Sequence, residues 1–339
     1  MNNKKSFLVL RFSSIGDIIL TTAVLRNLRQ AYPAARIDFM TLTDFAPLLE
    51  GHPAIDRVIM VDRKAGFRIL SRIGRRLRLD GYDYLIDLHN TLRAKIIRLH
   101  KGPVPALVFH KPRWKRFLLF RFYLNTFLPD FGIIRSLKAV VEPLTGPANS
   151  QPTELYVAPV ERQAVRNLLT SRRGNGRYVC IAPGAAWRQK QWRPEYYSQV
   201  IARIVNKFKL DIVLLGSAKD IICDEIGARC PTAINLRGAT TLRETLAIIA
   251  EADLIIGSDT GLTHAGEALG VSAIMILGPT SVETGAGPNR PDSVGIGLDL
   301  WCRPCSQSGS RRCYRREQFC MTGIGPEMVI QEVEKLITV

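Results

Sequence analysis

The chain has 339 residues, enough for two domains of about 150 to 190 residues that each bury a core. Its composition, 46% hydrophobic and 23% charged, excludes disordered, fibrous and low-complexity proteins. Lys and Arg number 47 against 30 Asp and Glu, and residues 1–150 alone hold 25 basic and 11 acidic side chains. The first half therefore predicts a negatively charged partner, such as nucleic acid, an anionic membrane surface or an acidic substrate, unless it is merely a soluble basic face.

No segment has the pattern of a signal peptide or a membrane span. Lys4 and Lys5 precede only a short apolar run at residues 7–10, which Arg11 ends. No apolar run approaches the roughly 20 residues that a membrane-spanning helix needs. We therefore expect a cytosolic protein. Its seven cysteines should be mostly reduced thiols, because an odd number argues against a complete disulfide framework.

In chain order, short β-branched runs alternate with helical stretches, which is typical of parallel sheets covered on both faces by helices. Strands are predicted at residues 7–11, 37–40, 57–61, 84–88 and 106–109, with a helix running from Asp17 through Leu28. Turn-forming residues cluster between 143 and 177 and indicate a domain boundary. The alternation then restarts, with strands at 178–182, 212–215, 233–236, 254–257 and 273–277 and helices at 194–208, 242–250 and from Thr260.

This alternation predicts an α/β protein with two doubly wound, Rossmann-like domains whose strand ends face each other across a cleft. We place the first domain at residues 1–165 and the second at 166–325. At 326–339 we expect a helix that packs back toward the domain junction. Ligands of open α/β sheets bind at the carboxyl ends of the strands, so function is expected in the strand-to-helix loops.

The loop after the first strand, residues 11–17, contains Ser14 and Gly16 and ends in Asp17. Small residues let a ligand approach the backbone closely. A carboxylate at this end of the sheet could take a proton from a bound hydroxyl as a general base. Asp17 equally suits the first turn of a helix, where it would only cap the N-terminus. The spacing leaves both roles open.

The loop after the first strand of the second domain, residues 182–194, sets Arg188, Lys190 and Arg193 beside a turn at Gly184. Cations in this position would neutralise a leaving diphosphate. The alternative is a solvated basic loop anchored by its two tryptophans. The site is favoured because the tryptophans lie so close in sequence to three cations.

A third loop, residues 257–266, contains Asp259, Thr260, Gly261 and His264. A small polar turn that opens a helix offers free N–H groups and a positive dipole end to an anion. Asp259 is expected to orient the loop, with Thr260 and Gly261 as donors to phosphate. A lone histidine is more often packed or capping than catalytic. Neither a GxGxxG nor a GxxxxGK[ST] motif supports a dinucleotide or P-loop site.

Four motifs, each near the end of a predicted strand, make the chain resemble glycosyltransferase family 9, the ADP-heptose:lipopolysaccharide heptosyltransferases. They are Ser-Ile-Gly-Asp at 14–17, Pro-Gly at 183–184 with Lys-Gln-Trp-Arg-Pro at 190–194, Ser-Asp-Thr-Gly-Leu-Thr-His at 258–264 and Leu-Gly-Pro-Thr at 277–280. The resemblance covers essentially the whole chain. It implies a GT-B architecture with an N-terminal acceptor domain and a C-terminal nucleotide-sugar domain. It also implies transfer of heptose from ADP-heptose to the lipopolysaccharide inner core with inversion.

The resemblance further implies roles for individual residues. Asp17 matches the base that deprotonates the acceptor hydroxyl, with Ser14 and Gly16 beside it at the acceptor. The donor diphosphate is expected on Lys190, Arg188, Asp259, Thr260, Gly261, Leu262 and His264. By a looser match, the donor nucleoside is expected on Asp220, Thr241 and Leu242. No Asp-x-Asp pair occurs in the chain, so we predict a metal-independent reaction without a cofactor.

Basic clusters in the first half have the acidic glycolipid acceptor as their expected partner, through Arg63, Arg113 and Lys115. Residues 111–123 mix cations with aromatic rings, as membrane-interfacial segments do. The same composition suits a surface helix whose aromatics pack on the sheet, and the sequence leaves both open. We expect the protein to work at the cytoplasmic face of the inner membrane. No nucleic acid is expected to bind, because no known nucleic-acid module occurs.

Near the C-terminus, a C-x2-C pair, Cys302 and Cys305, is followed by Cys313 and Cys320. Four thiolates can close a structural zinc site, but this spacing is not that of a standard finger, and reduced or disulfide-paired cysteines are favoured.

Three rival functions remain. A GT-B transferase could use another nucleotide sugar. A GT-B nucleotide-sugar epimerase would need no basic acceptor domain. A nucleic-acid-binding protein would bind nucleic acid through the basic half. That binding should weaken steeply as the salt concentration rises, and it should survive loss of Asp17.

Overall fold

The computed structural model describes residues 4–147, 152–170 and 176–337. They divide into two compact units. The first consists of the chain up to Pro112 and of Gly132–Tyr156, and the second of Arg113–Phe131 and the chain from Val157 onward. The sequence places the division after residue 165, inside a helix that packs within the second unit, whereas the compact units change after Tyr156. Residues 148–151 and 171–175 of the turn-rich stretch lie outside the described residues.

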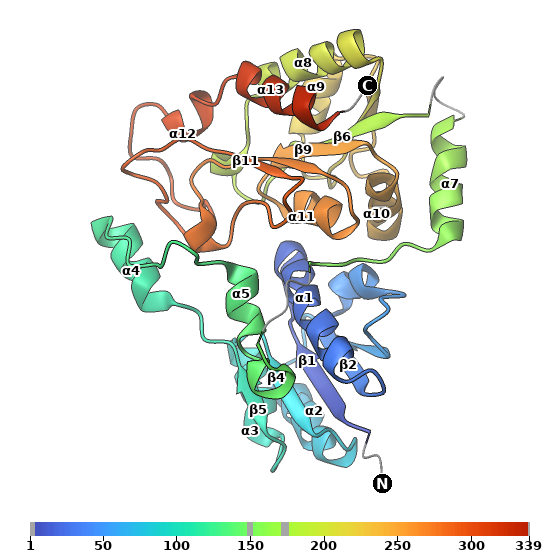
Figure 1. The fold of residues 1–339 in the computed structure, drawn as a ribbon, viewed down its shortest axis with the longest axis vertical. Coiled ribbons are helices and arrows are strands. Elements are labelled where there is room, and N and C mark those ends of the chain that lie inside the picture. The colour runs from blue at the N-terminus through green and yellow to red at the C-terminus, as the bar shows by residue number, and fades with distance from the viewer. Residues whose placement is uncertain (1–3, 148–151, 171–175, 338–339) are drawn as a thin grey trace. The chain divides into compact units, whose positions relative to one another are not determined.

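The first unit is built on a five-stranded parallel sheet (Figure 1). Its strands are β1 (Ser6–Leu10), β2 (Arg36–Leu42), β3 (Arg57–Val61), β4 (Tyr84–Asp87) and β5 (Ala106–Val108), in the order β3-β2-β1-β4-β5. The helical elements are α1 (Ile15–Ala31), the 3-10 helix η1 (Thr43–Leu49), α2 (Phe67–Leu79), α3 (Leu92–His100), α5 (Ile133–Lys138) and α6 (Glu142–Thr145). Alternating side chains of β1 serve the two faces of the sheet: Leu8 packs with Leu70 of α2 and Ile97 of α3, while Phe7 contacts Tyr32 after α1.

The second unit holds a six-stranded parallel sheet with the order β11-β10-β9-β6-β7-β8. The strands are β6 (Tyr178–Ala182), β7 (Asp211–Leu214), β8 (Ile234–Asn235), β9 (Leu254–Ser258), β10 (Ala273–Ile276) and β11 (Val294–Ile296). The longer helices are α4 (Arg113–Phe122), α7 (Pro159–Thr170), α8 (Pro194–Arg203), α9 (Ile222–Arg229), α10 (Leu242–Ala250), α11 (Gly261–Ala268) and α13 (Pro326–Leu336). Short helical pieces are η2 (Arg188–Lys190), η3 (Ile204–Phe208), η4 (Val282–Thr284) and α12 (Phe319–Thr322). Helices α8, α9 and α13 share one core with the sheet, and α10 and α11 cover its other face (Figure 1).

Each sheet reverses its strand order beside its first strand. In the first unit β1 lies between β2 and β4, and in the second β6 lies between β7 and β9. The loops after β1 and β4 therefore leave neighbouring strands at one carboxyl edge, as do the loops after β6 and β9. Such reversal points are where doubly wound sheets bind ligands.

The doubly wound parallel sheets predicted from the sequence are confirmed, and the ten predicted strands match β1 to β10 with small shifts at their ends. The sequence missed β11 and gave no bounds for the helices α2, α3, α5, α6 and α9. The predicted last helix is present as α13, and residues 338–339 lie outside the described part. Among the described residues, no helix combines the length and apolarity required to cross a bilayer.

Candidate active site

Asp17 lies in the first turn of α1, where it contacts the N-cap residue Ser14. Oδ2 of Asp17 accepts hydrogen bonds from the backbone N–H of Ser14 at 3.3 Å and from its hydroxyl at 3.1 Å. Nη2 of Arg11 pairs with the same oxygen at 2.7 Å. The polar contacts of Asp17 within the described residues all use Oδ2, and the side chain is 46% exposed, so Oδ1 is open to a ligand. The capping role is therefore present, and it leaves one oxygen for other chemistry.

The surroundings of Asp17 keep its carboxyl ionised. Burial raises the pKa of Asp17, but the Arg11 guanidinium and the hydrogen bonds of Ser14 outweigh burial and hold the pKa below its ordinary value. Arg11 is itself buried and fixed, because it donates to the carbonyls of Ser13 at 2.8 Å and Leu88 at 2.6 Å. Arg11 thus joins the loop after β1 to the loop after β4.

His89, in the loop after β4, belongs to the same group of side chains, although the sequence analysis did not select it. Its Nδ1 accepts the backbone N–H of Phe12 at 3.2 Å, which leaves the ring proton on Nε2. Burial, followed by the charges of Arg11 and Lys111, lowers the pKa of His89 to about 3, so the ring is neutral. His89 therefore offers a neutral N–H donor near the Asp17 carboxylate.

The loop that carries His89 is held by a buried carboxylate at the end of β4. Oδ1 of Asp87 accepts the backbone N–H groups of His89 at 2.9 Å and Asn90 at 2.8 Å, and Oδ2 lies 3.2 Å from Nε of Arg98. The run Asp-Leu-His-Asn at 87–90 was a usable signal, because it follows a predicted strand as the three selected loops do.

In the second unit, Asp259 joins the loop after β6 to the loop after β9. Oδ2 of Asp259 lies 2.6 Å from Nζ of Lys190 and 3.4 Å from the Thr280 hydroxyl. Oδ1 lies 3.3 Å from Nε2 of His264 and accepts the backbone N–H of Gly287 at 3.3 Å. The side chain is only 8% exposed, and both oxygens are engaged. Asp259 therefore orients two cations and a loop at once.

His264 lies between two buried carboxylates. Its Nδ1 is 3.7 Å from Oε2 of Glu267, whose other oxygen accepts the backbone N–H groups of Asn289 at 2.7 Å and Arg290 at 3.0 Å. Burial would lower the pKa of His264, but Asp259 and Glu267 raise it to about 9, so the ring is cationic at neutral pH. Burial raises the pKa of Asp259, yet His264 and Lys190 hold it well below its ordinary value. Glu267 was not among the predicted site residues.

The N-terminus of α11 opens beside this cluster. Thr260 is the N-cap residue, and its N–H donates to the Thr263 hydroxyl at 3.2 Å. Gly261 and Leu262 follow as the first helical residues, whose N–H groups have no acceptor within a helix. Gly257 lets the end of β9 approach β6 closely, because a Cβ there would lie 2.4 Å from the Ala182 carbonyl oxygen. The predicted diphosphate residues Lys190, Asp259, Thr260, Gly261, Leu262 and His264 are thus brought together, whereas Arg188 in the same loop is exposed.

The three predicted nucleoside residues are placed differently from one another. Asp220, in the loop after β7, binds the N–H and hydroxyl of Ser217 at 2.7 Å each, and its carboxylate lies against Gly184, where a Cβ would come within 2.4 Å of it. Thr241 caps α10 by accepting the N–H of Glu244 at 3.2 Å, and Leu242 begins that helix half-buried. Only Asp220 therefore borders the loop that carries Lys190.

The predicted acceptor residues are dispersed. Ser14 and Gly16 lie beside Asp17 in α1 and its cap. Arg63 is exposed and forms an ion pair with Asp44 at 2.7 Å. Arg113 and Lys115 are exposed on α4, which belongs to the second compact unit although the sequence assigns it to the first domain.

The cysteines are free thiols. Burial raises the pKa values of the Cys305 and Cys320 thiols, and neighbouring cysteines raise them further. Across the ranges that the structure describes, no group of three or more His, Cys, Asp or Glu side chains is arranged to hold a metal ion. The expectation that Cys302, Cys305, Cys313 and Cys320 are reduced or disulfide-paired instead of zinc-bound stays a prediction.

Comparison with known proteins identifies relatives along nearly the whole chain. The sequence model described as glycosyltransferase family 9 (heptosyltransferase) matches residues 70–314. Lipopolysaccharide heptosyltransferase 1 of Pseudomonas aeruginosa is 26% identical over 358 aligned positions, which cover 97% of each chain.

Two solved structures share the fold. A glycosyl transferase family 9 protein of Veillonella parvula superposes with a TM-score of 0.79 at 22% identity and covers 99% of this chain and 98% of its own. The Escherichia coli ADP-heptose lps heptosyltransferase II superposes with a TM-score of 0.75 at 22% identity, with 98% of both chains covered. The GT-B fold class predicted from the sequence is confirmed.

Proposed function

The chain belongs to glycosyltransferase family 9 (heptosyltransferase), and from this premise we propose that it transfers heptose from ADP-heptose to a hydroxyl of the lipopolysaccharide inner core. The names of the bacterial relatives, lipopolysaccharide heptosyltransferase 1 and ADP-heptose lps heptosyltransferase II, support this choice of donor and acceptor. The observation that carries the proposal is the buried cluster in which Asp259 holds Lys190 and cationic His264 beside the N-terminus of α11. Such a cluster suits a leaving nucleoside diphosphate.

In the proposed reaction the first unit supplies the base and the second unit stabilises the leaving group. Asp17 takes the proton of the acceptor hydroxyl on Oδ1, and the acceptor oxygen forms a bond to the anomeric carbon as the bond to the diphosphate breaks. Attack opposite the leaving group inverts that carbon. The negative charge that develops on ADP is stabilised by Lys190 and by the N–H groups of Gly261 and Leu262. The His89 N–H is suited to hold the acceptor sugar near Asp17.

The remaining assignments follow from position and chemistry. Asp220 is proposed to bind the donor ribose, because an acidic residue beyond the second strand of a Rossmann-like sheet meets the ribose hydroxyls. Thr241 and Leu242 are proposed to lie near the base, and Arg188 to assist at the diphosphate. Ser14 and Gly16, together with Arg63, Arg113 and Lys115, are proposed to contact the acidic acceptor.

We further propose that the reaction needs no metal and that the protein acts at the cytoplasmic face of the inner membrane. The absence of an Asp-x-Asp pair from the sequence supports the first point, because such a pair would clamp a metal on the diphosphate. The basic first half supports the second, because lipopolysaccharide precursors and inner-membrane lipids are anionic.

Calorimetric titration with ADP, UDP and GDP, each with and without magnesium, tests the proposal. We expect ADP to bind and UDP and GDP not to bind. The affinity for ADP should be the same with and without magnesium. Preference for UDP or GDP would overturn the donor and keep the fold. A requirement for magnesium would overturn the metal-independent reaction, and absence of binding to all three nucleotides would refute the assignment of the Lys190 cluster.

A further inference from the structure

Residues 111–129, called here the basic aromatic segment, carry five Lys and Arg side chains and no Asp or Glu. The segment contains α4 and the chain that follows it. The sequence leaves two explanations for its aromatic residues: they pack on a sheet, or they face a membrane surface. The structure distinguishes these explanations by exposure.

Five large apolar side chains of the segment are exposed. Trp114 is 71% exposed, Phe117 47% and Phe122 54%, and Leu124 and Leu128 beyond the helix are 56% and 68% exposed. The rings of Trp114 and Phe117 stack on each other, with centroids 5.3 Å apart, instead of inserting into a core. Packing on a sheet therefore does not explain these residues.

The helix is attached through other residues. Leu119 and Arg116 are its buried side chains, and Nε of Arg116 donates to the Glu283 carbonyl at 3.1 Å. Within the described part of the chain, α4 makes no extensive contact with any other helix or strand. Its exposed aromatic face and its cations Arg113, Lys115 and Arg121 thus lie on the surface of the second unit, where Figure 1 draws α4 apart from the sheet of that unit.

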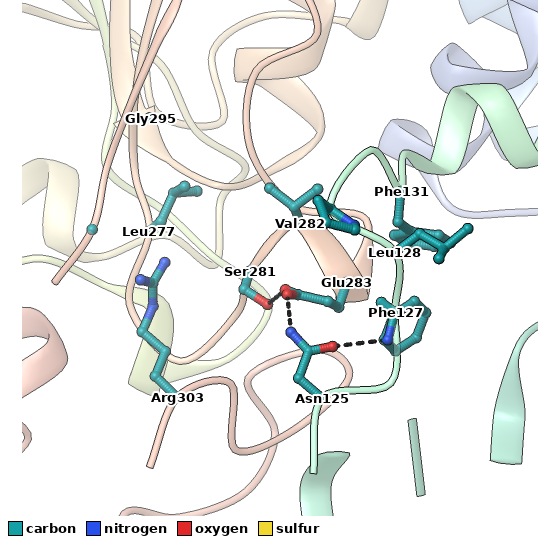
Figure 2. A pocket seen from close by; sticks show the side chains of 12 residues that line it. Asn125, Phe127, Leu128, Phe131, Leu277, Ser281, Val282, Glu283, Gly295 and Arg303 are labelled. Atoms are coloured by element: carbon teal, nitrogen blue, oxygen red, sulfur yellow. Dashed lines mark hydrogen bonds between the residues drawn. The ribbon is translucent and has the colours of Figure 1, made fainter. Parts of the chain in front are cut away.

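Beyond the helix, the segment lines a hollow of about 570 Å³ (Figure 2). Its lining combines apolar side chains, among them Phe127, Leu128 and Phe131, with the charged side chains of Glu283 and Arg303. The chain beside it is fastened by Asn125, whose amide donates to the Glu283 carboxylate at 2.7 Å. The exposed residues that follow α4 therefore lie on a fixed stretch of backbone beside a hollow of mixed polarity.

We propose that the basic aromatic segment docks this protein on a bilayer that contains anionic phospholipid. Tryptophan and phenylalanine insert at the boundary of head groups and acyl chains, and lysine and arginine pair with lipid phosphates. Exposed Leu124 and Leu128 favour acyl chains over nucleic-acid bases as the apolar partner. The inference rests on the proposed function only for the reason to be at a membrane, because a glycolipid acceptor is presented at such a surface.

The test is flotation of the full chain with vesicles of phosphatidylcholine, alone or mixed with phosphatidylglycerol, at low and high salt. We expect binding to the mixed vesicles only, weakened by salt. The double variant Trp114→Ala/Phe117→Ala should bind about tenfold less. Arg121→Glu should also weaken binding, through charge. Leu92→Ala/Leu99→Ala is the matched control, because these side chains are 75% and 80% exposed on basic helix α3 and should be dispensable.

Calorimetry with ADP separates this inference from the proposed function. Variants that keep the affinity of the wild type for ADP are folded, so a loss of vesicle binding then supports docking through the segment. Wild-type protein that binds anionic vesicles but not ADP would refute the proposed function and leave the docking surface standing. Equal vesicle binding by the wild type and the double variant would overturn the docking surface, as would tighter binding to an RNA oligonucleotide than to anionic vesicles.

Discussion

Asp17 and Asp259 occupy corresponding places in the two units, yet their surroundings differ. Each lies just past a strand beside the reversal point of its sheet, and each pairs with a cation, at 2.7 Å for Arg11 and 2.6 Å for Lys190. Asp17 is 46% exposed and uses one oxygen, whereas Asp259 is 8% exposed and uses both. An aspartate with an open oxygen can accept a proton, and one with both oxygens engaged can only hold its neighbours.

The difference suggests how one fold divides its work between two sheets. The loop after β1 keeps a charge available, and the loop after β9 uses a charge to fix two cations for a ligand. If this is correct, the same substitution at the two positions should affect different quantities: turnover at Asp17, and stability together with donor binding at Asp259.

The largest effect is expected for Asp17→Asn. Asparagine keeps the shape and can still accept from Arg11, but it cannot take a proton, so turnover should fall by about 10²- to 10⁴-fold. Affinity for ADP should stay within about twofold, since Asp17 is proposed to serve the acceptor. Transfer assays with ADP-heptose and a lipopolysaccharide acceptor, with ADP calorimetry as the control, measure both. Turnover equal to that of the wild type would exclude Asp17 as the base.

Asp259→Asn should instead lower the free energy of unfolding by about 3 kcal/mol, because it leaves half-buried Lys190 and buried His264 without their shared carboxylate. Urea denaturation measures the change. Asp17→Asn is the matched control: Arg11 is buried, but it keeps its hydrogen bonds to the Ser13 and Leu88 carbonyls when the exposed carboxylate is replaced, so the loss should be no more than about 1 kcal/mol. Equal stability losses in the two variants would contradict the contrast drawn between the two aspartates.

Lys190→Ala sharpens the comparison on the donor side. It removes the proposed charge-assisted contact to the diphosphate and would leave Asp259 facing that anion, so the Kd for ADP and the KM for the donor should rise roughly 10- to 100-fold. Arg193→Ala is the control from the same loop, because Arg193 is exposed and paired with Glu317 at 3.5 Å. Normal donor kinetics in Lys190→Ala, or an equal defect in Arg193→Ala, would refute the assigned role of Lys190.

The sequence was a good guide where local pattern decides the structure. Apolar β-branched runs marked the ten strands, and polar residues directly after them marked the loops of Asp17, Lys190 and Asp259. It was a poor guide where charge hides periodicity: α2 buries Leu70 and Leu77 on one face, but five arginines on the helix obscure that spacing. With three residues, one of them glycine, β11 has too little pattern to be recognised.

Contacts between residues far apart in the chain were the other feature that the sequence did not predict. Arg11 meets Leu88 because β1 pairs with β4, and that pairing depends on strand order, which local pattern does not encode. Likewise, Arg116 reaches the Glu283 carbonyl across 167 positions and carries α4 into the second unit. Glu267 was overlooked for the same reason, because tertiary neighbours give this otherwise ordinary residue its place in the site, whereas His89 follows a predicted strand and had a usable local signal.

The smallest expected effect is a pH dependence of the free energy of unfolding, which comes from His264 beside Asp259 and has no counterpart around Asp17. The pKa of His264 is raised to about 9 in the folded protein from about 6.5 when unfolded, so its stabilisation is complete below pH 6.5 and is lost as the pH rises through 9. The free energy of unfolding should therefore fall by about 1–2 kcal/mol between pH 7 and 9. Around Asp17 no such change is expected, because the pKa of Asp17 is depressed and that of His89 is about 3, below this window. Urea denaturation at several pH values, compared with His264→Gln to subtract other titrating groups, measures the difference. A wild-type curve that parallels the curve of the variant would show that His264 is not held as a cation between Asp259 and Glu267.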